Sequence, residues 1–244
     1  MNVQLLLAKT GQKIREAGFW ATLRSGFRMI SQRRVADDFD LQHGTDTGGE
    51  ESLWKLTIDS PSARFGRKYQ PSSEDELSEA VRFLDLDPRT LTFIDLGCGK
   101  GRTLLVAAKL GFKQVIGVEF TQELTEVARK NLQKMGISTG VVVQQDAGEY
   151  RFPECDIAVY LYNPFSEEIM RKVVLNLRES ETRRLYVIYK VPHCEALFDG
   201  SGFLTRVGCP PGREYIQVWR KTPRGSEARS SGLQERRETS RKTA

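Results

Sequence analysis

The residues most able to do chemistry stand together in one short segment. Asp95 lies two residues before Gly97, the first of three glycines that are spaced as Gly-x-Gly-x-Gly and end at Gly101. Glycine lets the backbone turn tightly and lets a ligand approach the peptide groups. The dinucleotide fingerprint Gly-x-Gly-x-x-Gly would need its third glycine one residue later, and no Gly-x-x-x-x-Gly-Lys-Ser/Thr phosphate loop occurs. The spacing therefore indicates a ligand-binding turn that differs from both phosphate-binding motifs.

The elements that must position this turn alternate between apolar runs and amphipathic segments. The apolar runs predict strands over residues 91–96, 114–119, 141–146, 156–162 and 185–190. Helices are predicted over residues 103–110, after Thr121 and over residues 166–177, and the capping-box spacing of Ser73 and Glu76 starts an earlier helix. Residues 203–207 and 214–219 predict a C-terminal antiparallel hairpin. Together these elements predict an α/β fold with a mostly parallel seven-stranded sheet covered on both faces.

The segment from Phe93 to Arg102 resembles motif I of the class I S-adenosylmethionine (SAM) dependent methyltransferases. The resemblance implies the Rossmann-like fold of that family, with SAM as cofactor. Glu119, at the end of the second predicted strand, would accept hydrogen bonds from both ribose hydroxyls. SAM has no phosphate and carries a sulfonium cation, so nearby acids attract it, whereas they would repel a pyrophosphate. The residues implied to shape the cofactor pocket are Asp95, Gly97, Cys98, Gly99 and Gly101.

Two further strand ends extend this resemblance. Asp146 and Ala147 end the third predicted strand, where the family places a residue against the adenine amino group. Asn163, Pro164 and Phe165 follow the fourth strand and are similar to the Asn/Asp-Pro-Pro-Tyr/Phe motif of nitrogen methyltransferases, with the second proline missing here. An Asn oxygen accepts hydrogen bonds from an amine and so turns its lone pair toward the methyl group. The resemblance implies that these residues orient the acceptor beside the cofactor, although Asn and Pro are also common where a strand turns into a helix.

A shorter resemblance precedes the glycine turn. Tyr69-Gln70-Pro71-Ser72 is similar to the segment that helps close over the methionine part of SAM in Dot1-like and mitochondrial lysine methyltransferases. Tyr69 and Ser72 are therefore expected to contact the cofactor, and a plain helix start would explain the same residues. The pattern from His43 through Phe165 also resembles a group of bacterial methyltransferases without an assigned substrate.

The net charge of +5 is concentrated at the two ends of the chain. Residues 1–34 hold seven Lys or Arg against one Glu, residues 221–244 carry +4, and residues 35–220 carry −5. We therefore divide the chain into a basic amphipathic N-terminal helical extension (1–40), a methyltransferase domain (41–220) and a disordered basic tail (221–244). The basic ends suggest an anionic partner or a membrane surface, although the N-terminal helix would equally pack on the core. The acidic middle favours a basic protein segment as substrate.

We expect methyl transfer from SAM to an acceptor nitrogen, with a protein amine such as lysine as the preferred acceptor. The alternatives are a SAM-fold binding module without catalysis and a Rossmann-like oxidoreductase with a nicotinamide cofactor. No metal site is expected, because the two histidines are far apart and the four cysteines lack a Cys-x-x-Cys spacing. The longest apolar run, residues 157–162, is far shorter than the roughly 18 residues that span a bilayer, so a cytoplasmic enzyme is expected. The sequence identifies no general base.

Overall fold

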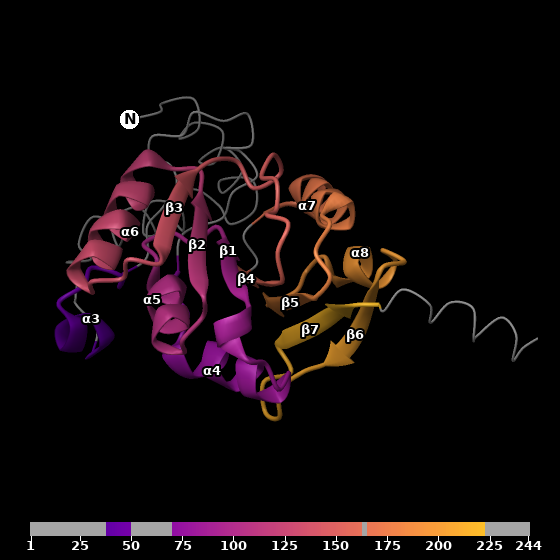
Figure 1. Ribbon diagram of the computed structural model, residues 1–244, viewed down its shortest axis with the longest axis horizontal. Coiled ribbons are helices and arrows are strands. Elements are labelled where there is room, and N and C mark those ends of the chain that lie inside the picture. The colour runs from indigo at the N-terminus through magenta and orange to yellow at the C-terminus, as the bar shows by residue number, and fades with distance from the viewer. Residues whose placement is uncertain (1–37, 50–69, 163–164, 223–244) are drawn as a thin grey trace, which may run out of the picture.

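A seven-stranded sheet runs through the described part of the chain (Figure 1). The structure is a computed structural model and describes residues 38–49, 70–162 and 165–222. The strands are β1 (Thr92–Leu96), β2 (Gln114–Glu119), β3 (Gly140–Gln144), β4 (Ile157–Tyr162), β5 (Leu185–Lys190), β6 (Leu204–Gly208) and β7 (Ile216–Lys221). They lie in the order β3-β2-β1-β4-β5-β7-β6. Strands β1 to β5 pair in parallel, and β7 pairs antiparallel with β5 and β6. This topology confirms the predicted class I methyltransferase fold.

Helices cover both faces of the sheet. They are α3 (Asp38–His43), α4 (Glu74–Phe83), α5 (Arg102–Lys109), α6 (Gln122–Lys134), α7 (Glu167–Glu179) and α8 (Glu195–Asp199), with a 3-10 turn η3 (Pro88–Thr90). The predicted capping box starts α4, since the Ser73 amide donates to Glu76 Oε2 at 2.9 Å. Helices α3 and α8 were not predicted, because their 6 and 5 residues are too few to show a helical repeat of apolar positions.

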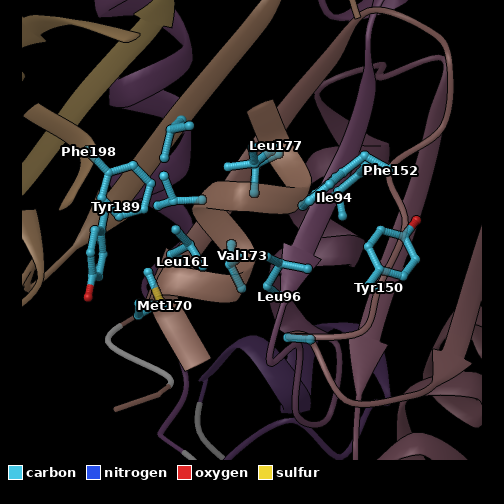
Figure 2. Packing of buried hydrophobic residues seen from close by; sticks show 14 of the residues in the cluster. Ile94, Leu96, Tyr150, Phe152, Leu161, Met170, Val173, Leu177, Tyr189 and Phe198 are labelled. Atoms are coloured by element: carbon cyan, nitrogen blue, oxygen red, sulfur yellow. The ribbon is translucent and has the colours of Figure 1, made fainter. Parts of the chain in front are cut away.

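The strands alternate between two hydrophobic layers. In β1, Phe93 joins the layer beneath α4, α5 and α6, whereas Ile94 and Leu96 join the layer beneath α7 and α8. Figure 2 shows this second layer, where Met170 and Val173 of α7 lie beside the strand side chains. Because the central strands are buried on both faces, they are apolar without interruption, as parallel strands usually are.

Parallel pairing brings the carboxyl ends of five strands to one edge of the sheet. The last residues of these strands are Leu96, Glu119, Gln144, Tyr162 and Lys190. The strand order reverses between β1 and β4, and ligands of open α/β sheets bind at such a switch point. Because β7 runs antiparallel, its first residue, Ile216, pairs with Lys190 at the same edge. The carboxyl edge is therefore where a binding site is expected.

Several predictions from the sequence lie outside the described residues. They concern the amphipathic helix over residues 1–34, the tail beyond residue 222, Tyr69, Asn163 and Pro164. The division of the chain into three segments therefore stays a prediction. Within the described ranges, no helix is both long and apolar enough to cross a membrane.

Gly117 of β2 packs where the glycine turn meets α5. A Cβ atom there would lie 2.6 Å from both Cys98 Sγ and Leu104 Cδ1. We expect Gly117→Ala to lower the free energy of unfolding by about 2 kcal/mol, the usual effect of overpacking a core, as measured by urea denaturation. The control is Gly111→Ala, whose added Cβ would meet nothing within 4 Å at a φ of +85°. Backbone strain alone should cost it about 1 kcal/mol. Native stability of Gly117→Ala would contradict the close packing.

Candidate functional site

The glycine turn after β1 has a conformation that its three glycines make accessible. Gly97, Gly99 and Gly101 have φ angles of 83°, 54° and 86°, in the left-handed region that other residues rarely adopt. The amides of Gly97 and Cys98 donate to the carbonyl oxygen of Val118 in β2, at 2.8 and 3.1 Å. The turn is thus tied to the neighbouring strand before it enters α5.

Glu119, at the end of β2, connects the glycine turn to the start of α6. Its Oε2 accepts a hydrogen bond from the Gly99 amide at 3.0 Å, and its Oε1 accepts from the Thr121 amide (3.0 Å) and hydroxyl (2.9 Å). The residue is 4% exposed, and burial raises its pKa despite these hydrogen bonds. A carboxylate offers about four lone-pair positions. Oε2 therefore retains capacity to accept a ligand hydroxyl.

Asp95 of β1 gives the site a second buried carboxyl group. It is 3% exposed and accepts a hydrogen bond from the Thr103 hydroxyl of α5. Burial raises the pKa of Asp95 to about 7, because the bond from Thr103 offsets only part of the burial and the charge of Glu119 raises the pKa further. Two neighbouring carboxyl groups of this kind form a site that a cation stabilises.

A small pocket opens beside these groups. Its walls are Gln70, Pro71, Ser72, Asp95, Gly97, Cys98, Arg102, Thr103, Tyr160 and Tyr162. Ser72 Oγ lies 2.9 Å from Tyr160 Oη, which joins the segment before α4 to β4. A larger hollow lies at the amino ends of the strands, around Thr92 and Arg183, away from the glycine turn.

The loop over residues 43–49 is held by Asp40 of α3. The Asp40 carboxylate accepts hydrogen bonds from the hydroxyls of Thr45 and Thr47 and from the amides of Thr47 and Gly48, at 2.6–2.8 Å. Burial alone would raise the pKa of Asp40, but the bonds from Thr47 and Thr45 hold it below its ordinary value. The role of Asp40 could not be predicted from the sequence, because no motif marks an acid whose hydrogen-bond partners follow within one loop.

Two cations of the glycine segment fasten the turn to this loop. Lys100 Nζ donates to the Gly48 carbonyl at 2.9 Å and to Asp46 Oδ1 at 3.2 Å, and Arg102 Nε donates to Thr47 Oγ1 at 2.8 Å. Both cationic side chains are buried. Arg102 also lines the pocket, which the sequence analysis had not assigned to it. The loop is thus anchored by Lys100, which lies between two of the glycines, and by Arg102, which directly follows the last one.

The structure brings most of the predicted cofactor residues to one place. Those in the pocket wall are Ser72, Asp95, Gly97 and Cys98, and those adjoining it through the same turn are Gly99, Gly101 and Glu119. Cys98 is 4% exposed, and burial, followed by the charges of Asp95 and Glu119, raises the pKa of its thiol. The Cys98 side chain therefore acts as an uncharged wall of the pocket.

Three further predicted residues, Asp146, Ala147 and Phe165, are not part of this pocket wall. Asp146 follows β3, and its Oδ1 accepts the Gly148 amide at 2.8 Å. Ala147 and Phe165 are buried in the layer beneath α7. Tyr69, Asn163 and Pro164 are outside the described residues. The roles of all the predicted site residues, those in the pocket wall included, stay predictions.

The centre of the chain is similar to a known protein family. Residues 88–181 match a family model described as "Methyltransferase domain". The matched segment includes the glycine turn, Glu119 and strands β1 to β4. This match bears out the resemblance that motif I indicated: the centre of the chain is similar to a methyltransferase domain, over less than half of its length.

Curated relatives and solved structures show similarity over parts of the chain. The ribosomal protein L11 methyltransferase of Hamiltonella defensa is 32% identical over 100 residues, which are 41% of this chain and 32% of that protein. Its counterpart in Klebsiella pneumoniae is 31% identical over 121 residues, 48% of this chain and 40% of that protein. The chain thus spans less than half the length of these relatives.

A solved structure of ribosomal protein L11 methylase from Lactobacillus delbrueckii subsp. bulgaricus has a TM-score of 0.46 at 17% identity, covering 63% of this chain and 80% of that one. An RNA methyltransferase from Salinibacter ruber in complex with S-adenosyl-L-homocysteine has a TM-score of 0.46 at 22% identity. It covers 63% of this chain and 94% of that one.

The buried Asp95 should make stability depend on pH. Its pKa of about 7 in the folded chain exceeds the ordinary value of 3.8, so the folded state keeps a proton that the unfolded state releases in this range. The contribution of Asp95 to the free energy of unfolding is therefore largest below about pH 4. As the pH rises to about 7 this contribution is lost, which lowers the free energy of unfolding by at most about 4 kcal/mol. Between pH 5 and pH 8, the free energy of unfolding measured with urea should fall less in Asp95→Asn than in the native chain. An equal loss would contradict the raised pKa.

Proposed function

We propose that this protein is a SAM-dependent methyltransferase that methylates a nitrogen atom, with an amine of a protein as its acceptor. One observation carries the choice of cofactor: Asp95 and Glu119 place two buried carboxyl groups at the glycine turn. Such a pair would repel the pyrophosphate of a nicotinamide dinucleotide, while a sulfonium, an ammonium group and a ribose diol complement it. The observation supports SAM over a nicotinamide cofactor.

The residues around the pocket fit the parts of SAM. Glu119 Oε2 has capacity for a ribose hydroxyl, and an ammonium group near Asp95 would favour the charged form of that carboxyl group. Arg102 lines the same pocket and offers a cation to the carboxylate of the methionine part. Asp146, just after β3, is the proposed contact for the adenine amino group.

The chain's own part in the reaction is to orient the acceptor and to exclude water. SAM supplies an activated methyl group, so few catalytic side chains are needed. Asn163 and Pro164 directly follow Tyr162, which lines the pocket. The Asn163 side chain and the backbone carbonyl that follows would accept hydrogen bonds from the acceptor amine. Phe165, buried beneath α7, would anchor this turn to the core.

Two observations support a protein acceptor. The curated relatives carry names that make them methyltransferases of ribosomal protein L11, which is itself a protein. Residues 35–220 carry a net charge of −5, which attracts a basic protein segment. The basic ends of the chain would in addition recruit an anionic partner. A basic protein that belongs to a nucleic-acid complex satisfies both features.

Calorimetric titration tests the cofactor. The native chain should bind SAM and S-adenosylhomocysteine and should bind neither NADH nor NADPH. Glu119→Gln should weaken SAM binding about 10- to 100-fold, because a hydrogen bond to a charged group contributes about 1.5–3 kcal/mol. The matched control is Glu126→Gln, exposed on α6, which should bind SAM as the native chain does. Binding of NADPH in place of SAM would sink the proposed function.

Transfer of a labelled methyl group from SAM to a mixture of basic proteins, ribosomal proteins included, tests the acceptor. Asn163→Ala should lower turnover about 100-fold, the usual effect of removing one hydrogen-bonding group from a reacting centre, with SAM affinity nearly unchanged. Asn163→Asp keeps an acceptor oxygen and should retain most of the turnover. Equal losses of binding and turnover in Asn163→Ala would refute its role. SAM binding without transfer to any acceptor would favour the binding-module alternative.

A further inference from the structure

A buried ion pair lies at the end of β5, close to the pocket wall. Lys190 Nζ lies 2.7 Å from Glu76 Oε2, and the two side chains are 9% and 7% exposed. The pair joins the carboxyl edge of the sheet to the first turn of α4. Desolvating two charges is costly, and apolar side chains of similar size often stabilise a core equally well. The pair therefore indicates a role beyond stability.

Glu76 fixes the segment that forms one wall of the pocket. The Oε2 atom that pairs with Lys190 also accepts the Ser73 amide at 2.9 Å, which determines where α4 begins. The preceding residue, Ser72, lines the pocket, and its hydroxyl lies 2.9 Å from Tyr160 Oη. The charge of Lys190 thus holds Glu76 in the position that places Ser72 in the wall.

Lys190 also contacts Tyr162, a second part of the pocket wall. Its ammonium group lies 3.9 Å from the centroid of the Tyr162 ring, within the range of a cation–π interaction. The Tyr162 hydroxyl donates to Gln70 Oε1 at 3.1 Å, and both residues line the pocket. One ammonium group is therefore linked to Tyr162 through the ring face and to residues 70–73 through Glu76.

The backbone directly after Lys190 is strained. Val191 has a φ of 52°, a left-handed conformation that a β-branched residue rarely adopts. Its amide donates to the Tyr215 carbonyl at 2.7 Å, one residue before β7. Such strain persists where surrounding contacts enforce it, and it is frequent near functional sites. This strained residue ends β5 at Lys190 and fixes the backbone from which the ammonium group reaches Glu76 and Tyr162.

We propose that Lys190 is a positioning residue of the methyltransferase site: through Glu76 and Tyr162 it fixes how residues 70–73 lie against the end of β4 in the pocket wall. The inference rests on the proposed function, which assigns this pocket to SAM and its acceptor. Lys190 acts through these two side chains. The property that the position requires is a positive charge, because only a cation satisfies both the carboxylate and the ring face.

SAM binding by matched ion-pair variants of the full chain tests the inference. Lys190→Met removes the charge and keeps a long side chain, and Lys190→Met/Glu76→Gln leaves no unpaired charge buried. Both should raise the Kd for SAM about ten-fold, whereas Lys190→Arg should keep it within about three-fold of native. The control is Lys109→Met/Glu74→Gln, which removes a more exposed pair, 3.0 Å apart, at the same end of α4. It should leave the Kd unchanged.

Fluorine NMR separates positioning from a loss of stability. In protein labelled with 3-fluorotyrosine, the signal that disappears in Tyr162→Phe belongs to Tyr162. That signal should shift or broaden in Lys190→Met/Glu76→Gln and return near its native position in Lys190→Arg. The signal of Tyr186, near the other end of β5, should not move. If the Met variants do not fold, Glu76→Gln alone, which keeps an acceptor for the Ser73 amide, gives the same readout.

The outcomes separate this inference from the proposed function. If the native chain binds no SAM, the proposed function fails, and the Tyr162 signal alone decides whether Lys190 holds the ring. If the native chain binds SAM, and the folded double variant binds it equally well with an unmoved Tyr162 signal, the inference is overturned. A lower melting temperature with native Kd and native Tyr162 signal assigns the pair to stability alone and overturns it as well.

Discussion

The carboxylate of Glu119 holds together the two turns on which the site is built. It accepts the Gly99 amide from the turn after β1 and the amide and hydroxyl of Thr121 from the turn after β2. Each turn begins a helix, so one side chain sets the relative position of two strand-to-helix junctions. The glycines make the first turn accessible, and the bond to Glu119 fixes its orientation. A ribose diol would therefore meet a carboxylate that is already ordered, at little cost in side-chain entropy.

The acidic and the basic side chains around the glycine turn have different contacts. Asp95 and Glu119 are buried at the turn, and burial raises the pKa of both carboxyl groups. Lys100 and Arg102, from the same segment, reach the loop that Asp40 holds. Lys100 does not line the pocket, whereas Arg102 does, so the turn presents carboxyl groups and one guanidinium group there. As a consequence, the position of the glycine turn depends on residues 38–49, which lie before the matched family segment in the sequence.

Much of this architecture could be predicted from the sequence, because it depends on local signals. Buried parallel strands are apolar runs, and the predicted bounds of β2 and β5 agree with the structure. The glycine turn was predicted from its three glycines, which the left-handed backbone conformation of the turn requires. Contacts between distant segments leave no such signal. Arg102 and Thr47 are 55 positions apart, and Lys190 and Glu76 are 114 apart, so neither a repeat nor a motif records them.

The antiparallel end of the sheet explains how residues far from the glycine turn reach the site. Because β7 runs opposite to β5, Ile216 lies beside Lys190, and the loop before it also reaches the carboxyl edge. There Arg213 binds Glu79 of α4 at 2.6 Å, on the helix that carries Glu76. The C-terminal hairpin therefore braces the helix whose first residues follow the pocket wall. Parallel strands build the part of the carboxyl edge that carries the glycine turn, and the reversal at β7 supports helix α4 beside it.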